Sequence, residues 1–256
     1  MNQEKAIQFV QQNGNEIELA RLRFLLHGER PSTTIIQQLF NGQRDDGGFA
    51  PFWAPNYSSI DATCYRLAQA EQLGLDRTKP AIDKAVRFLL GRQRQDGRFA
   101  EDGSVADSAP PWAAPGDLAA ELYLTANVGF WLAFFGFDDA ARQSANFLAA
   151  HLDTQSHKLP SFAQAQWLAC GLAWKLGLDE MVDHLASHLY AQLPGSAGEL
   201  AWMLVTLRSV DFPADRGVIV SGSLRLARMQ AADGRFPSDE GQDVHTTLEA
   251  LRAITK

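Results

Sequence analysis

Apolar residues recur three and four positions apart along most of the chain, which is the spacing of one face of an α-helix. The pattern is clear in residues 30–43, 78–93 and 215–230, and each segment begins near Ser, Thr, Pro or Asp, which favour helix N-termini. The segments that follow, residues 57–75 and 241–256, are richer in small and apolar residues, as expected of more enclosed helices. No segment alternates polar and apolar residues as a strand would. The pattern predicts an all-α protein.

The same alternation continues between residues 115 and 212 through five further segments. Their boundaries pair a Gly or Pro with an acidic residue or a Ser suited to an N-cap. With two helices in residues 1–28, we expect about twelve helices in six consecutive pairs. The last helix has an apolar face where an open superhelix would need a polar cap. We therefore predict a single (α/α)6 barrel over residues 1–256, in which one helix of each pair lines a central cavity.

A short motif, Gln-x-x-Asp-Gly-x-Phe, interrupts the helical pattern at residues 43–49, 93–99 and 230–236. Its Gly can adopt the positive φ that ends a helix, and its Asp can accept hydrogen bonds from backbone N–H groups in the turn. The Phe is expected to fill the seam between neighbouring hairpins, and the Gln amide to bond across it. We interpret the motif as a structural brace.

In its third copy the motif leads into Asp243-x-x-x-Thr247-x-x-Ala250-Leu251. This combination resembles the repeat of protein prenyltransferase β-subunits and of squalene–hopene and oxidosqualene cyclases, and the resemblance covers nearly the whole chain. It implies an α-α toroid with a cavity for an isoprenoid-like, apolar substrate. A fold of this kind does not by itself define a reaction.

The repeats can be aligned on the Thr of Asp-x-x-x-Thr, which superposes Thr63, Thr125 and Thr247. The middle position of this frame is then occupied by three polar residues: Asp61, Tyr123 and His245. In the cyclases an Asp at this place donates the proton that starts cyclisation, although the full Asp-x-Asp-Asp string of that family is absent here. The resemblance thus implies Asp61 as the catalytic acid, assisted by His245 and Tyr123. His245 has an alternative interpretation, a hydrogen bond to a neighbouring loop.

The prenyltransferases bind zinc through an Asp-x-Cys pair and a His, and the corresponding residues here would be Asp61, Cys64 and His245. Asp61 and Cys64 are one residue too far apart, and His245 comes one place early. A slip of one residue turns a helical side chain by about 100°. We expect no cofactor, and zinc at these residues stays an open alternative.

Aromatic residues are frequent on and just before the predicted inner helices, and ring faces can stabilise a cation or an apolar ligand. Core filling is the alternative for each ring. The candidate substrate-binding residues are Trp53, Tyr57, Trp112, Trp131, Trp167 and Trp202. Residues 99–117, rich in Ala, Pro, Gly and Asp, are predicted to form a lid with Trp112 pointing inward.

Hydrophobic residues make up 46% of the chain and charged residues 21%, which is typical of a globular protein. A net charge of −7 with scattered basic residues argues against a nucleic-acid partner. The N-terminus resembles no signal peptide and no apolar run is long enough to span a bilayer, so we expect a soluble, cytoplasmic protein. Cys64 and Cys170 are interpreted as buried thiols.

The leading hypothesis is a terpenoid cyclase or prenyltransferase-like protein that performs acid-initiated cyclisation or isomerisation. A non-catalytic binding or scaffold protein of the same fold is one alternative. A glycan-processing (α/α)6 enzyme is another, and its carboxylates would be Asp61, Asp117, Glu121, Glu199 and Asp243.

Overall fold

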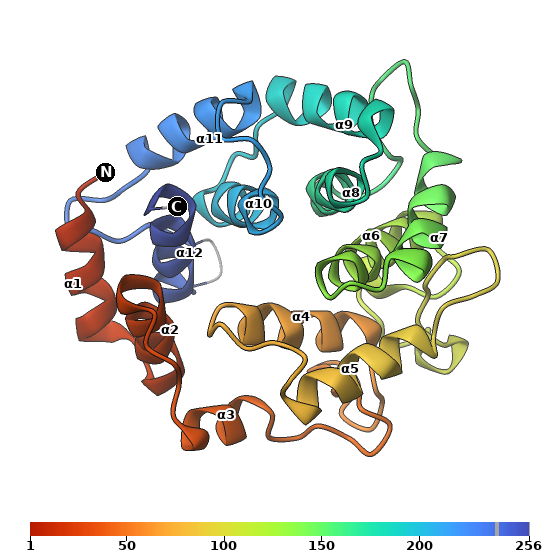
Figure 1. The fold of residues 1–256 in the computed structure, drawn as a ribbon, viewed down its shortest axis with the longest axis horizontal. Coiled ribbons are helices and arrows are strands. Elements are labelled where there is room, and N and C mark those ends of the chain that lie inside the picture. Colours follow the sequence, from red (N-terminus) through yellow and green to blue (C-terminus); the bar gives the residue numbers. More distant parts are fainter. Residues whose placement is uncertain (239–240, 256) are drawn as a thin grey trace. The chain divides into compact units, whose positions relative to one another are not determined.

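The computed structural model describes residues 1–238 and 241–255. These residues form twelve α-helices and two short 3-10 helices, with isolated bridges and no β-strand (Figure 1). The predicted all-α class and number of helices are confirmed, and their consecutive pairs have the order of an α-α toroid. The first six helices are α1 (Gln3–Asn13), α2 (Glu16–His27), α3 (Thr33–Leu39), α4 (Ile60–Glu71), α5 (Pro80–Leu90) and α6 (Leu118–Phe134). The others are α7 (Asp138–Ala149), α8 (Ala163–Lys175), α9 (Asp179–Ala191), α10 (Ala197–Ser209), α11 (Gly217–Arg228) and α12 (Asp243–Thr255).

The chain divides into two compact units, which are described separately. The first unit comprises Met1–Gln38, Gln72–Gly74 and Leu189–Lys256. The second unit comprises Leu39–Glu71 and Leu75–His188.

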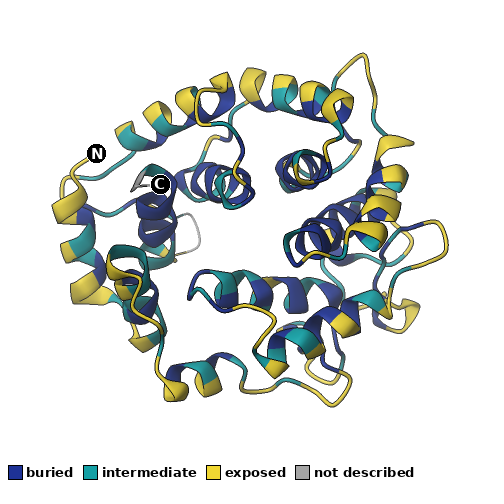
Figure 2. Cartoon of the chain, in the orientation of Figure 1, coloured by how far each residue is buried: buried dark blue, intermediate teal, exposed yellow. Residues whose placement is uncertain are grey.

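The core of the second unit is built on α6, which contacts α4, α7 and α8. The Asp117 carboxylate caps this helix by accepting a hydrogen bond from the backbone N–H of Ala120. Every residue from Ala120 to Ala133 is buried, because the helix is apolar on all sides. In contrast, α5 and α7 bury one face only and expose the other (Figure 2).

The core of the first unit is built on α12, which contacts α1, α2, α10 and α11. Leu248 and Leu251 of α12 pack with Val10 of α1 and Leu22 of α2. The predicted alternation of enclosed and amphipathic helices is present in both units, since in the first unit α10 is largely buried and α11 buries one face.

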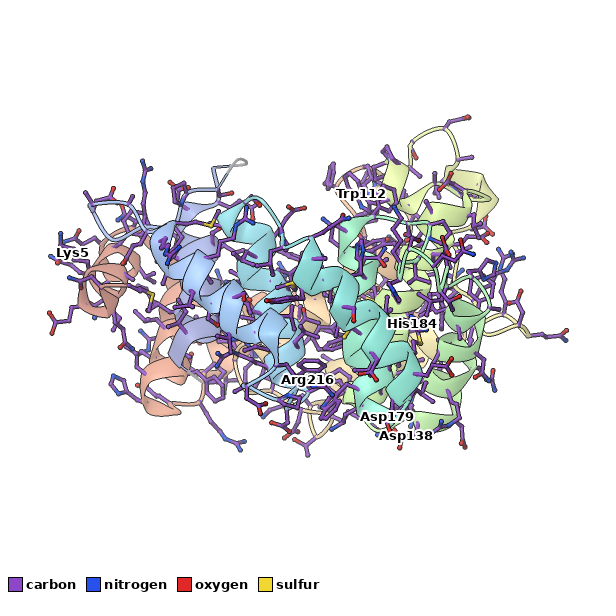
Figure 3. All side chains as sticks on the ribbon, turned by 90° about the horizontal axis from the view of Figure 1, so that it is seen from above. Lys5, Trp112, Asp138, Asp179, His184 and Arg216 are labelled. Carbon is purple, nitrogen blue, oxygen red and sulfur yellow. The ribbon has the colours of Figure 1, made fainter. Side chains whose placement is uncertain are left out.

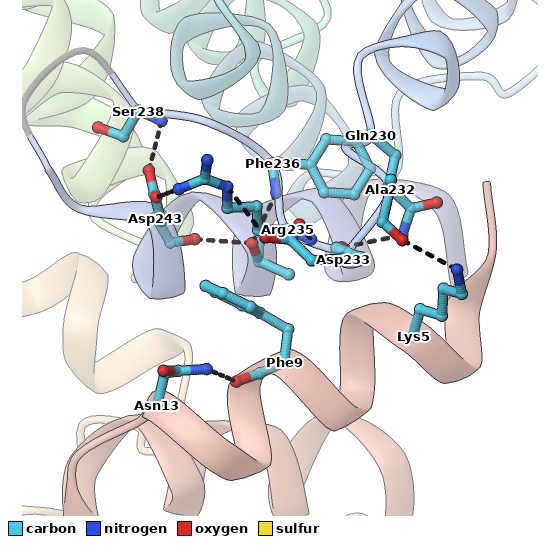
Figure 4. Close-up of polar contacts among 12 residues, drawn as sticks. Lys5, Phe9, Asn13, Gln230, Ala232, Asp233, Arg235, Phe236, Ser238 and Asp243 are labelled. Carbon is cyan, nitrogen blue, oxygen red and sulfur yellow. Dashed lines mark hydrogen bonds and ion pairs between the residues drawn. The ribbon is translucent and has the colours of Figure 1, made fainter.

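Each motif copy joins the two helices of one pair: α3 to α4, α5 to α6, and α11 to α12. Their glycines, Gly47, Gly97 and Gly234, all have positive φ, at 93°, 87° and 97°. Each Gln Nε2 donates to the carbonyl of its own turn Gly and to a carbonyl at the start of another outer helix. The second acceptors are Ala81 in α5, Ala140 in α7 and Asn2 before α1, each at 2.8 Å. The predicted structural role of the motif is confirmed, and Figure 4 shows its third copy against α1.

The Phe of each motif copy is buried, and its backbone N–H donates to the threonine hydroxyl of the following helix. The pairs are Phe49 with Thr63 (3.1 Å), Phe99 with Thr125 (2.9 Å) and Phe236 with Thr247 (2.9 Å). These are the threonines on which the repeats were aligned, so the frame predicted from the sequence is confirmed. Asp61 and Tyr123 therefore occupy equivalent places on α4 and α6.

Replacing Thr125 with Val should lower the free energy of unfolding by about 1–3 kcal/mol, because the buried N–H of Phe99 would lose its acceptor. Urea denaturation measures the change. Thr34, exposed on α3, provides the matched control, and its replacement with Val should cost about 0.5 kcal/mol or less. Equal losses in the two variants would show that the threonine does not support the motif.

Candidate active site around Asp61

The repeat that carries Asp61 differs from the other two motif-bearing repeats. In those two, a motif Arg forms an ion pair with the first residue of the frame: Arg98 with Glu121 (2.9 Å) and Arg235 with Asp243 (2.8 Å). The first repeat has Gly48 and Ser59 at these positions, so this ion pair cannot form. The start of α4 is instead bound by a carboxylate from the loop after the second motif.

That carboxylate belongs to Glu101, which is 1% exposed. It accepts hydrogen bonds from the hydroxyls of Ser59 (2.6 Å) and Tyr57 (2.9 Å) and from the N–H groups of Ile60 (3.1 Å) and Asp61 (3.2 Å). Burial raises the pKa of Glu101, and these hydrogen bonds act in the opposite direction. Glu101 thus satisfies free N–H groups at the start of α4, where the helix dipole favours a negative charge.

Asp61 lies in the first turn of α4, and two side chains donate hydrogen bonds to its carboxyl. Its Oδ1 accepts from the Tyr123 hydroxyl (2.9 Å), and its Oδ2 accepts from the Trp112 indole N–H (3.1 Å). Asn127 in turn donates to the Tyr123 oxygen (3.4 Å). The structure therefore brings Asp61, Tyr123 and Trp112 together, and the predicted lid over residues 99–117 stays a prediction.

Trp112 lies in the second of two short 3-10 helices, η1 (Gly103–Val105) and η2 (Pro111–Ala113), within residues 99–117. The η2 turn contacts α6, which holds Tyr123, and Trp112 keeps 37% of its surface exposed. In Figure 3 it lies at the opposite end of the second unit from Asp138 and Asp179, which begin α7 and α9. The Asp61 carboxyl is thus covered by one partly exposed side chain from a loop.

The surroundings of Asp61 favour protonated side chains. Burial raises the pKa of Asp61, and the hydrogen bonds from Tyr123 and Trp112 lower it by less. Burial and the nearby Asp61 charge raise the pKa of Tyr123, which stays a donor. Burial also raises the pKa of the Cys64 thiol. The site therefore holds a neutral carboxyl at a higher pH than an exposed Asp would allow.

His245, in the first unit, has a different environment. Its Nδ1 lies 3.1 Å from Nη1 of Arg21, and since a guanidinium only donates, the imidazole nitrogen accepts. Arg21 also pairs with Glu249 (2.8 Å), which contacts Arg252 (3.4 Å). Burial and the Arg21 charge lower the pKa of His245. The contact made by His245 is with a helix, α2, and its assistance to Asp61 stays a prediction.

The predicted aromatic residues are in several environments. Trp167 has no exposed surface, and Trp131 packs on Phe130, Phe134 and Phe135, about 12 Å further along α6 than Tyr123. Both rings fill the core. Trp202 is half-buried in the first unit.

Trp53 and Tyr57 lie in the loop before α4, with ring centroids 6.3 Å apart. Tyr57 is linked to the site through its hydrogen bond to Glu101. Burial is the main cause that raises the pKa of Tyr57, so its hydroxyl keeps its proton and acts as a donor. Of the six predicted rings, Trp112 is the one that directly contacts Asp61 within the described residues.

The carboxylates proposed for a glycan-processing site are largely engaged in structure. Asp117 caps α6, while Glu121 and Asp243 form ion pairs with motif arginines. This arrangement gives no support to a pair of carboxylates across a glycan cleft.

No group of three His, Cys, Asp or Glu side chains in residues 1–238 and 241–255 is arranged to hold a metal ion. The raised pKa of Cys64 also opposes a thiolate ligand. Asp61 and Cys64 lie in the second unit and His245 in the first, and zinc at these three residues stays a prediction. The same part of the chain has no helix whose length and apolar character would let it cross a membrane.

No protein-family model matches the chain, and no curated protein sequence matches it. A crystal structure of a protein from Actinoplanes is similar over 99% of this chain and 97% of its own, with a TM-score of 0.61 and 16% identity. At 16% identity this likeness shows a shared fold and says nothing about chemistry.

Proposed function

We propose that this protein is an acid–base catalyst of the terpenoid cyclase type, in which Asp61 donates a proton to an apolar, isoprenoid-like substrate. The proposal depends on one observation, the partly buried Asp61 carboxyl between the Tyr123 and Trp112 donors. A general acid must carry its proton near the working pH, and burial favours that state here. The residue also occupies the frame position of the proton donor in the cyclases that the chain resembles.

The proposed reaction begins when Asp61 transfers its proton to one carbon of a substrate double bond. The π electron pair of the double bond forms the new C–H bond, and the electrons of the broken O–H bond stay on the Asp61 carboxylate. The other carbon becomes a cation. Tyr123 and Trp112 already donate to the two carboxylate oxygens and stabilise the charge that develops on Asp61. A proton lost from a neighbouring carbon returns to Asp61, so the isomerised or cyclised product has the composition of the substrate.

The segments that carry the site also bear exposed apolar side chains, which an apolar substrate could contact. Phe52, in the loop before α4, is 86% exposed, and Leu118, the first residue of α6, is 45% exposed. Trp112, on the loop that leads into α6, is also partly exposed.

Replacing Asp61 with Asn should reduce the proton transfer by about 10²–10⁴-fold, because an amide has no acidic proton to give. The full chain would be incubated in D₂O with a panel of isoprenoid alcohols and diphosphates, and deuterium in the recovered compounds would be measured by mass spectrometry. Asp107, exposed in the same loop as Trp112, provides the control, and its change to Asn should leave the uptake unaltered. Equal uptake in wild type and Asp61→Asn would refute the assignment of the acid.

A non-catalytic binding protein of the same fold is the second candidate. It is favoured by the fact that both Asp61 oxygens already accept hydrogen bonds from side chains of the protein itself. Binding of a panel compound without any deuterium uptake by the wild type would support this candidate over the enzyme.

A further inference from the structure

A second group of titratable side chains lies in the second unit, apart from the acid site. His157, in the loop between α7 and α8, and His184, on α9, face each other with their Nδ1 atoms 2.5 Å apart and their ring centroids 4.8 Å apart. Both side chains are partly exposed, and His184 is labelled on α9 in Figure 3. Two imidazoles in direct contact are neither a packing necessity nor part of the proposed reaction.

The loop holds His157 in a defined position. Asp153 and Lys158 form an isolated antiparallel bridge, and the Asp153 carboxylate accepts from the N–H and the hydroxyl of Ser156. His157 itself has a φ of 57°, in the left-handed region that non-glycine residues seldom adopt. Backbone strain of this kind persists where the surroundings fix it, and it is frequent at functional sites.

We propose that His157 and His184 bind a late first-row transition-metal ion, such as Cu²⁺ or Zn²⁺, through their Nδ1 atoms. Neutral imidazole is the common protein ligand for these ions. The described residues place no third ligand in position, so water completes the coordination.

Metal binding requires a small movement and a tautomer change. Bonds of about 2.0–2.1 Å to a tetrahedral ion separate two ligand nitrogens by roughly 3.3 Å, so the Nδ1 atoms must move apart by about 1 Å. Partly exposed side chains have room for this. The imidazole that donates its Nδ1 proton in the metal-free contact must carry that proton on Nε2 instead, which leaves both Nδ1 lone pairs for the ion.

The test is a titration of the untagged full chain with Cu²⁺, followed by electron paramagnetic resonance and by calorimetry, with Zn²⁺ as a second probe. We expect one tightly bound Cu²⁺ whose spectrum shows nitrogen ligands. His157→Ala and His184→Ala should each weaken binding by about tenfold or more, since even residues that only orient a ligand cost that much when lost. His151→Ala is the matched control and should bind like the wild type, because its Nδ1 contacts the carbonyl of Phe147.

Circular dichroism would confirm that the variants are folded, and His184→Asn would replace any variant that is not. Unchanged Cu²⁺ affinity in folded variants of both His157 and His184 would overturn the proposal. The proposal would also be overturned if the wild type bound Cu²⁺ no more tightly than a variant that carries both His157→Ala and His184→Ala.

Discussion

Replacing Gly97 with Ala is expected to lower the free energy of unfolding by about 3 kcal/mol or more. Gly97 has a φ of 87°, which costs an L-residue about 1–2 kcal/mol. A Cβ at this position would also lie 2.2 Å from the backbone carbonyl oxygen of Gln143 in α7, so the motif turn would have to move away from that helix. Overpacking of this kind costs about 1–3 kcal/mol.

Urea denaturation of Gly97→Ala beside Gly103→Ala measures this effect. Gly103 has an ordinary φ and no atom within 4 Å of a built Cβ, so its replacement should change stability by about 0.5 kcal/mol or less. Equal stabilities of the two variants would mean that the motif does not hold neighbouring hairpins together.

Replacing Glu101 with Ala is expected to cost about 3–5 kcal/mol, because it leaves four donors around a buried site without their acceptor. The start of α4 should then open more often, and the geometry of Asp61 should be lost with it. Urea denaturation would give the stability, and hydrogen exchange of the Ile60 and Asp61 amides would report the opening. Asp102→Ala, on the exposed neighbour, should leave that exchange unchanged. If both amides were as protected from exchange in Glu101→Ala as in the wild type, Glu101 would not be what holds the start of α4 in place.

Much of the fold could be predicted because its signals are local. Helical periodicity predicts the helices, and the Gly and Asp of the motif predict the turns, because both signals act within a few residues. The threonine frame extended this to contacts between helices, since Thr63 and Thr125 bond equivalent Phe residues. The same frame put Asp61 and Tyr123 at equivalent positions on two helices, and the structure adds the hydrogen bond between them.

The rest of the site depends on contacts that no local pattern encodes. Glu101 binds residues about forty positions away, and the one signal for it was an acid two places after Phe99, where the other copies have Pro51 and Ser238. The sequence also could not distinguish a core ring such as Trp167 from a ring beside the acid such as Trp112. That difference is set by tertiary packing.

The central claim is that Asp61 is a partly buried carboxyl whose pKa lies above the usual value of aspartate. In the folded protein the pKa of Asp61 lies above its ordinary value of 3.8. At pH values between 3.8 and the folded pKa, the folded protein therefore holds a proton that the unfolded chain has lost. Stability should therefore decrease as the pH rises through this window, and Asp61→Asn should remove that part of the decrease.

The measurement that tests this most directly is a carbon-13 NMR titration of the aspartate carboxyls, with the Asp61 signal assigned by its absence in Asp61→Asn. The account predicts a midpoint above 3.8 for Asp61. It also predicts that Tyr123→Phe raises this midpoint further, since the phenol donates to the charged form. A midpoint at or below 3.8 would contradict the account, because the folded protein would then hold the Asp61 proton no more tightly than an exposed carboxyl does.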